Sequence, residues 1–314
     1  MMRIAPYLAL AGRALEANFR RLSHPYKLTF CLTFWCNYRC ETCNIWKMKP
    51  RDELRLDEIQ RFFRQSPGFL WVDLTGGEVS LRKDFVDICE AVVSSCPHLL
   101  LLHFETFRRL REMPGVDVVL GMTLSAKNVD HFPQAFAAAR REIPDLAYGD
   151  FHVNIVHESS HYLGNTELGL RSRVGAEALA RATEGYAQLR GRARSPVDFL
   201  ERAYLKRVRR YVETGATPMR CHALRASCFV DSWGNVFPCT VYDRRIGNLR
   251  EVDYDLARIW NTPAAATLQA EIWESRCPNC WTPCEAYQSI LGNLVRPELP
   301  RFRRSRPRPV VGSA

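Results

Sequence analysis

The amino-acid sequence predicts an α/β protein: a partial (βα) barrel of about five to six parallel strands, followed by a small cysteine-rich α+β C-terminal domain. Two observations support this fold class. Short, nearly continuous apolar runs alternate with amphipathic segments through the first half of the chain, and prolines and cysteines gather in its last third. Parallel strands that are covered by helices have such unbroken apolar runs.

The first expected element is an amphipathic helix over residues 5–22. Leu8, Ala11, Leu15 and Phe19 fall on one face at helical spacing, and the arginines lie mostly elsewhere. This apolar face predicts that the helix packs on the body of the protein. Contact with a membrane surface is the alternative.

Strand-like and helix-like segments then alternate along the chain. The predicted strands are residues 27–34, 69–75, 98–104, 116–124 and 151–157. The predicted helices between them are residues 56–65, 83–95, 105–113 and 127–142. In such an arrangement the carboxyl ends of the strands meet at one face, which is where barrel enzymes build their active sites.

Composition suggests how the chain divides into domains. We expect an N-terminal helix in residues 1–26, a barrel core in 27–165, a helical bridge in 166–217, a cysteine-rich domain in 218–292 and a basic Pro/Arg-rich tail in 293–314. The cysteine-rich part lacks the apolar runs of a large independent core, so a bound metal is expected to stabilise it. The tail is expected to be disordered.

The 12 cysteines and the net charge of +10 restrict the function. The chain has no apolar stretch long enough for a transmembrane helix and no signal peptide, so a cytoplasmic location is expected. In a reducing compartment clustered cysteines favour metal binding over disulfides. Much of the excess charge lies at the two ends of the chain. No nucleic-acid motif accompanies it, so no nucleic-acid partner is expected, while contact with lipid or an acidic peptide stays open.

The first cysteine cluster follows the first predicted strand. Cys36, Cys40 and Cys43 have the spacing C-x3-C-x2-C. Three thiolates on a tight loop can hold a [4Fe-4S] cluster and leave its fourth iron open to a further ligand. A structural zinc ion would require a fourth protein ligand. The other early cysteines, which are interpreted as core residues, are Cys31, Cys89 and Cys96.

This loop resembles the signature of the radical SAM superfamily, and Thr75-Gly76-Gly77-Glu78 after the second strand resembles the family's GGE motif. The resemblance implies that Gly76, Gly77 and Glu78 contact the amino group of S-adenosylmethionine (SAM). Glycines let a backbone approach a ligand closely, and a carboxylate suits an ammonium group. Further candidates for cofactor contact are Ser125, Asn154, Glu105, Thr106 and Asn128.

The resemblance implies a radical SAM enzyme. Such an enzyme reductively cleaves SAM at the cluster to give a 5′-deoxyadenosyl radical, which abstracts a hydrogen atom from a substrate, here unknown and expected to be peptide or lipid-like. The electron would come from a reductant such as flavodoxin or ferredoxin. The family core has six βα units, whereas five strands are predicted here, and residues 103–117 leave little room for the missing unit. The alternative is therefore a non-catalytic iron–sulfur or zinc protein for binding or electron transfer, built on a reduced radical SAM scaffold.

A second cysteine cluster lies in the C-terminal domain. Cys221, Gly234 and Cys239 bracket a predicted hairpin over residues 228–238, and Cys277 and Cys280 form a C-x2-C pair. The pattern resembles the auxiliary-cluster extension called SPASM in its full form and twitch in its shorter form. It implies that Cys221, Cys239, Cys277 and Cys280 hold an auxiliary [4Fe-4S] cluster. Cys228 and Cys284 are alternates, and a zinc ribbon on the same four cysteines is the competing interpretation.

Overall fold

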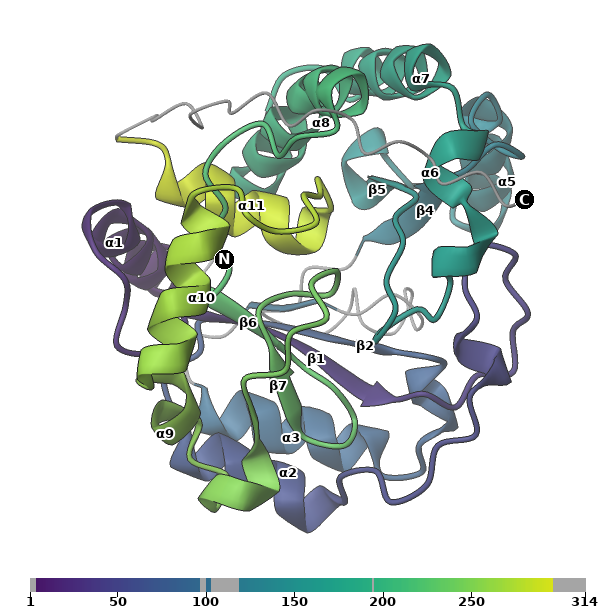
Figure 1. The fold of residues 1–314 in the computed structure, drawn as a ribbon. Coiled ribbons are helices and arrows are strands. Elements are labelled where there is room, and N and C mark those ends of the chain that lie inside the picture. Colours follow the sequence, from purple (N-terminus) through teal and green to yellow (C-terminus); the bar gives the residue numbers. More distant parts are fainter. Residues whose placement is uncertain (1–3, 97–99, 103–118, 194, 296–314) are drawn as a thin grey trace, which may run out of the picture.

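A computed structural model describes residues 4–96, 100–102, 119–193 and 195–295 (Figure 1). The predicted helix 105–113, most of the tail, and Glu105 and Thr106 lie outside these ranges. In chain order the first elements are α1 (Ile4–Phe19), β1 (Lys27–Thr33), η1 (Ile45–Lys47), α2 (Leu56–Gln65), β2 (Trp71–Gly76), η2 (Val79–Leu81), α3 (Phe85–Ser95), β3 (Leu100–Leu102), β4 (Leu120–Leu124), α5 (Phe132–Glu142), η3 (Tyr148–Asp150) and β5 (Phe151–Ile155). Every predicted strand thus overlaps a strand of the structure.

Residues 166–214 are mainly helical, as predicted, and short strands and helices follow them. These are η4 (Thr166–Leu168), α6 (Leu170–Arg173), α7 (Ala176–Leu189), α8 (Pro196–Thr214), β6 (Ser227–Val230), β7 (Asn235–Phe237), β8 (Gly247–Asn248), η5 (Leu249–Val252), α9 (Leu256–Trp260), α10 (Pro263–Trp273) and α11 (Pro283–Gly292). The predicted hairpin is present as β6 and β7, which pair antiparallel. No helix among the described residues is long and apolar enough to span a membrane.

Two sheets organise the molecule. The larger has the order β3-β2-β1-β6-β7-β8, and β4 pairs in parallel with β5 in the second. β1 lies parallel to both β2 and β6, with Lys27 level with Trp71 and with Ser227. Helices α2 and α3 lie along one side of the larger sheet, and α8 and α11 lie on its other side (Figure 1). The predicted α/β class is confirmed, and closure of a parallel barrel stays a prediction.

The N-terminal helix packs on the body, but through the face opposite to the one predicted. Leu8, Leu15 and Phe19 are 67%, 49% and 53% exposed. The buried face consists of Leu10, Ala14, Ala17 and Asn18. It packs on α11, where the side chain of Asn18 donates a hydrogen bond to the carbonyl of Leu291. Small alanines allow this close packing, which the larger side chains of the predicted face would prevent.

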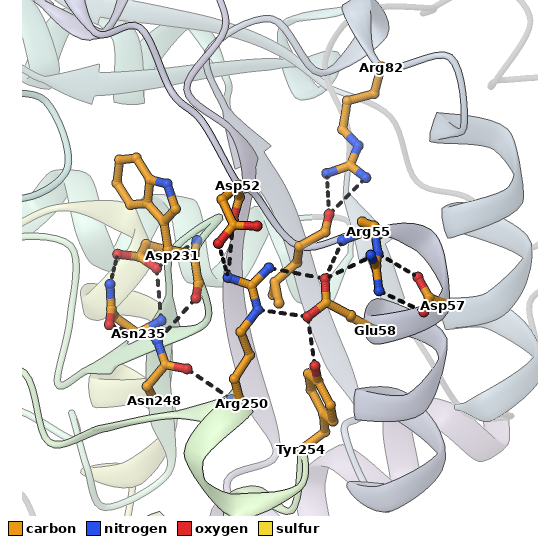
Figure 2. Close-up of polar contacts among 12 residues, drawn as sticks. Asp52, Arg55, Asp57, Glu58, Arg82, Asp231, Asn235, Asn248, Arg250 and Tyr254 are labelled. Carbon is orange, nitrogen blue, oxygen red and sulfur yellow. Dashed lines mark hydrogen bonds and ion pairs between the residues drawn. The ribbon is translucent and has the colours of Figure 1, made fainter.

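The C-terminal segment shares the core of the N-terminal part. One hydrophobic cluster joins Phe30 of β1 and Phe62 of α2 to Val230, Leu249 and Trp260. A network of ion pairs and hydrogen bonds also connects these two regions (Figure 2). Figure 2 shows Arg250 between Asp52 and Glu58, with the hydroxyl of Tyr254 donating to the same Glu58 carboxylate. Residues about 190 positions apart are therefore held against each other by both packing and charge.

Candidate functional site

The loop of Cys36, Cys40 and Cys43 follows the carboxyl end of β1. Cys40 is exposed and the other two thiols are half-buried. The amide of Cys43 donates to the carbonyl of Cys40 (3.2 Å), and the amide of Ile45 donates to the sulfur of Cys43 (3.4 Å). Burial raises the pKa of Cys43 to about 11, and the neighbouring Cys40 and Cys36 thiols add to the shift. The three thiols therefore lie close enough to interact electrostatically, as the spacing predicted.

The Gly-Gly-Glu segment is hydrogen-bonded to the backbone at the end of β1, just before this loop. The amides of Gly77 and Glu78 donate to the carbonyls of Thr33 and Trp35, both at 2.7 Å. A Cβ atom on Gly77 would overlap the Trp35 carbonyl oxygen, and one on Gly76 would overlap that of Thr33. The two glycines are thus required by contact with the β1 backbone, while their predicted contact with a ligand stays a prediction.

A loop after β5 anchors the cysteine loop from the other side. The buried side chain of Asn165 donates to the carbonyl of Thr42 at 2.8 Å, and the side chain of Asn44 donates to the carbonyl of Gly164 at 2.9 Å. The hydroxyl of Tyr162 lies 2.7 Å from that of Thr75 on β2. Sequence reasoning missed these roles, since an Asn in a polar loop carries no signal of the distant carbonyl that it will meet.

A cavity of about 430 Å³ opens beside the cysteine loop. Cys40, Thr42 and Cys43 form one part of its wall. The rest comes from strands and from the helices opposite, and includes Thr29, Asp73, Thr75, Thr123, His152, Asn154, Tyr162, Glu201, Cys284 and Tyr287. This cavity connects the thiols to side chains of β1, β2, β4 and β5, which is the arrangement expected at the carboxyl ends of parallel strands.

The predicted contact residues differ in their relation to this cavity. Asn154 lines the cavity, and its side-chain oxygen Oδ1 is buried without a hydrogen-bond partner in the described part of the chain. Glu78 is buried and accepts hydrogen bonds from the amide and hydroxyl of Ser80. Ser125 is held in a turn by Asn128, whose side-chain oxygen accepts from the Ser125 amide at 2.7 Å. Their binding of a cofactor stays a prediction.

Charged side chains lie deeper along the cavity. The fully buried Lys27 pairs with Asp73 at 2.9 Å; burial opposes its charge, but Asp73 leaves the pKa of Lys27 raised. His152 lies 2.8 Å from Glu201, which also accepts a hydrogen bond from Tyr287. Burial opposes the charge of Glu201 as well, yet His152 holds its pKa below the usual value. Asp73, His152 and Glu201 line the cavity, and each of them is paired with a neighbouring side chain.

The predicted auxiliary cysteines lie in a buried region where their thiols affect one another's pKa. Burial raises the pKa of Cys221 well above its usual value, and the nearby Glu285, Cys280 and Cys277 raise it further. The pKa of Cys239 is raised by burial and by Glu285, Cys280 and Cys221. Cys221 therefore interacts with Cys280 and Cys277, and Cys239 interacts with Cys280 and Cys221, while their joint binding of a cluster stays a prediction.

The two alternates differ in their surroundings, and Cys228 belongs to the same hydrophobic cluster as Cys221 and Cys239. Cys228 is fully buried on β6, and its raised pKa comes from burial and Glu285. Cys284 lines the cavity, where burial raises its pKa to about 12 against the charge of Lys27. The choice of Cys221, Cys239, Cys277 and Cys280 as the ligand set stays a prediction.

The thiols fit iron–sulfur clusters in their chemistry. Backbone amides point at several sulfurs: Ala223 donates to Cys221 (3.5 Å), and Tyr242 donates to Cys239 (3.2 Å). Such hydrogen bonds stabilise thiolates and tune clusters. A tetrahedral zinc site needs ligand atoms about 4 Å apart around one ion. Within the described ranges no group of three or more His, Cys, Asp or Glu side chains is arranged to hold a single metal ion.

Comparisons with known proteins agree with this arrangement. Residues 221–281 match the sequence model of the SPASM family, an iron–sulfur cluster-binding domain. The fold is similar to that of SuiB from Streptococcus suis bound to S-adenosylmethionine, with a TM-score of 0.51 and 17% identity over 80% of this chain and 69% of SuiB. SuiB bound to the precursor peptide SuiA gives a TM-score of 0.50 and 15% identity over 94% of this chain and 78% of SuiB. The predicted resemblance is confirmed in the C-terminal domain and in the fold.

Proposed function

We propose that this chain, which carries a SPASM domain and shares its fold with a SAM-bound protein, is a radical SAM enzyme with one cluster at Cys36, Cys40 and Cys43 and an auxiliary cluster at Cys221, Cys239, Cys277 and Cys280. The single observation that carries the proposal is the cavity. It joins the thiols of the C-x3-C-x2-C loop to polar side chains on four strands.

The chain would hold the SAM-binding cluster by the three thiolates of the loop. When bound, the cluster and SAM supply a one-electron cleavage whose carbon radical can remove a hydrogen atom from a substrate. The protein's part is to position the reactants and to exclude water. Asn165, Asn44 and Gly77 fix the loop through backbone contacts, and Tyr162 with Thr75 closes the wall next to it.

Asn154 is the residue that we assign to cofactor contact within the cavity. Its side-chain oxygen is buried and has no hydrogen-bond partner in the described part of the chain, and a buried polar atom of this kind is costly unless a ligand or water pairs with it. Glu78 would support cofactor binding indirectly. Its backbone amide donates to the carbonyl of Trp35 and so joins the Gly-Gly-Glu segment to the start of the cysteine loop.

The substrate would enter the deeper part of the cavity. There His152, Glu201 and Tyr287 form one hydrogen-bonded group, and Asp73 faces them from β2. A peptide side chain is the substrate that we favour, because SuiB binds a precursor peptide, and a lipid-like molecule is the second choice. A flavodoxin or ferredoxin would be the electron donor.

The test is anaerobic purification and reconstitution, followed by reduction with dithionite and assay of 5′-deoxyadenosine. Wild-type protein is expected to form 5′-deoxyadenosine from SAM, and Cys40→Ala is expected to form none. Intact clusters with no 5′-deoxyadenosine in excess SAM would overturn the enzyme assignment and leave a non-catalytic iron–sulfur protein. Zinc without sulfide would overturn both cluster assignments.

A further inference from the structure

The cavity beside the cysteine loop contains an imidazole that is held at one ring nitrogen and open at the other. His152 of β5 places its Nδ1 2.8 Å from the carboxylate of Glu201 on α8 and 3.0 Å from the hydroxyl of Tyr287 on α11. Its Nε2 forms no hydrogen bond within the described part of the chain, and it is not among the buried atoms that lack a partner there. Because His152 lines the cavity and its side chain is 14% exposed, Nε2 is the nitrogen that a bound molecule can reach.

The surroundings of Nδ1 fix the tautomer of this imidazole. The Glu201 side chain is 2% exposed, and its carboxylate accepts hydrogen bonds from Nδ1, from the hydroxyl of Tyr287 and from the amide of Val153. Burial opposes the charge of Glu201, but His152 and Arg190 keep the pKa of Glu201 below its usual value. An ionised carboxylate can only accept hydrogen bonds, so neutral His152 carries its proton on Nδ1 and a free lone pair on Nε2.

The same carboxylate stabilises His152 after the ring gains a proton. A proton taken up at Nε2 makes the ring positive, while buried Glu201 stays in hydrogen-bond contact with the opposite nitrogen. Charge-assisted hydrogen bonds of this kind are about twice as strong as neutral ones. His152 can therefore both accept a proton from a bound molecule and hold it.

Two other acid–base groups that line the cavity are poorer proton acceptors. One oxygen of Asp73 pairs with Lys27 at 2.9 Å, and the other accepts a hydrogen bond from the indole of Trp71 at 2.6 Å, so both oxygens are engaged. Burial raises the pKa of the Cys284 thiol to about 12, so this thiol stays protonated at neutral pH. Compared with these two groups, His152 has the lone pair that is free to take a proton.

We propose that His152 accepts a proton from the substrate through Nε2, and that Glu201 and Tyr287 position its ring for this step. The inference rests on the proposed function and names the class of substrate. This is an alcohol, amine or thiol whose O–H, N–H or S–H lies on the atom next to the reacting C–H.

The proposed step balances as an oxidation of the substrate by two electrons. The hydrogen atom of the C–H goes to the carbon radical of the cleaved SAM, and the proton of the O–H, N–H or S–H goes to Nε2 of His152. The remaining electron goes to the auxiliary [4Fe-4S] cluster, and a double bond forms between the two substrate atoms. The carbon radical and the cluster are each reduced by one electron.

The first test measures the imidazole in the reconstituted full chain, with the clusters oxidised and no SAM present. Protein with isotope-labelled histidine is studied by nitrogen NMR, and the His152 signals are assigned by their absence in His152→Gln. Wild type is expected to show the Nδ1–H tautomer. Glu201→Gln is expected to lower the ratio of the Nδ1–H to the Nε2–H tautomer about tenfold, because a neutral hydrogen bond replaces a charge-assisted one.

Glu213→Gln is the matched control, because Glu213 lies on the same helix but pairs with Arg209 at the surface. It should leave the tautomer of His152 unchanged, and an equal change in both variants overturns the inference. Circular dichroism and cluster absorbance show whether each variant is folded. The wild-type spectrum alone also overturns the inference if His152 carries its proton on Nε2.

Benzyl alcohol and benzyl methyl ether test the acceptor role of Nε2 itself. Benzyl alcohol has a C–H next to an O–H, and its ring suits a cavity wall that includes Trp71, Phe151 and Tyr287. The ether has the same ring but no O–H. The alcohol is expected to shift the Nε2 signal of His152, and the ether is expected to leave it unchanged. Equal shifts with both molecules, or no shift with either, overturn the inference.

Assay of 5′-deoxyadenosine separates failure of this inference from failure of the proposed function. Formation of 5′-deoxyadenosine by a protein whose His152 gives neither NMR response overturns the inference and leaves the proposed function in place. The expected NMR responses in a protein that cleaves no SAM overturn the proposed function and, with it, the oxidation step that rests on it.

Discussion

Replacing Glu58 with glutamine removes one charge from a buried ion pair that joins two distant parts of the chain. The Glu58 carboxylate lies 2.7 Å from the guanidinium of Arg250; the Glu58 side chain is 9% exposed and that of Arg250 is 29% exposed, so solvent screens the pair only in part (Figure 2). Hydrogen bonds from Arg250 lower the pKa of Glu58 from 4.5 to about 2, against the effect of burial. A shift of this size corresponds to about 3 kcal/mol in favour of the charged form.

We expect Glu58→Gln to lower the free energy of unfolding at pH 7 by about 2 kcal/mol, since the amide keeps the shape but leaves Arg250 with only the exposed Asp52 as a counter-charge. The pKa of Glu58 is lower in the folded state than its unfolded value of 4.5, so the ionised carboxylate stabilises the folded state fully above pH 4.5. This contribution to the free energy of unfolding is lost as the pH falls toward the folded pKa of about 2. The difference between wild type and variant should therefore shrink by about 1 kcal/mol between pH 7 and pH 4.

The assay is urea-induced unfolding under anaerobic conditions, followed by tryptophan fluorescence at several pH values. Asp57→Asn is the matched control: it lies on the same helix and pairs with Arg55, but both side chains are at least 70% exposed. Such exposed pairs contribute about 0–1 kcal/mol. Equal destabilisation by the two variants, or a difference that is independent of pH, would refute the reasoning.

Three further predictions concern the first cluster. Cys40→Ala should reduce iron from about eight to about four per chain and leave the absorbance of the auxiliary cluster; iron analysis would contradict this if both clusters were lost together. Gly77→Ala should greatly reduce loading of the first cluster, because its methyl group overlaps the Trp35 carbonyl, and Gly175→Ala, where the added methyl meets open space, is the control. Asn165→Ala should speed loss of iron from the first cluster during chelator challenge without changing the second, since it removes the hydrogen bond to Thr42; unchanged kinetics would argue against an anchoring role.

Local patterns were sufficient to predict most elements. The apolar runs that became β1, β2 and β5 are short and largely buried, so the sequence of each run indicates its strand. The packed face of α1 could not be predicted in this way, because both sides of that helix are apolar. Large side chains dominate the periodic pattern, whereas the packing on α11 selects the small Ala14 and Ala17.

The candidate ligand cysteines could be proposed for the same local reason. A C-x3-C-x2-C loop and a C-x2-C turn bring sulfurs together within a few residues, whatever surrounds them. The residues that support them come from elsewhere. Asn165 is 123 positions from Thr42, and Arg250 is 192 positions from Glu58. Only the tertiary fold determines which of many polar side chains reaches a given carbonyl or carboxylate.

The pairing of β6 with β1 is the feature that relates the two cysteine groups, and no local pattern indicated it. Because Lys27 is level with Ser227, Cys221 lies near the start of β1, whereas the first cysteine loop follows its end. The cavity runs between these ends, from Cys40 to Asp73 and Cys284. A single sheet thus sets the separation of the two groups, so a change that shifts β6 against β1 should alter both sites, while a change confined to either loop should alter one.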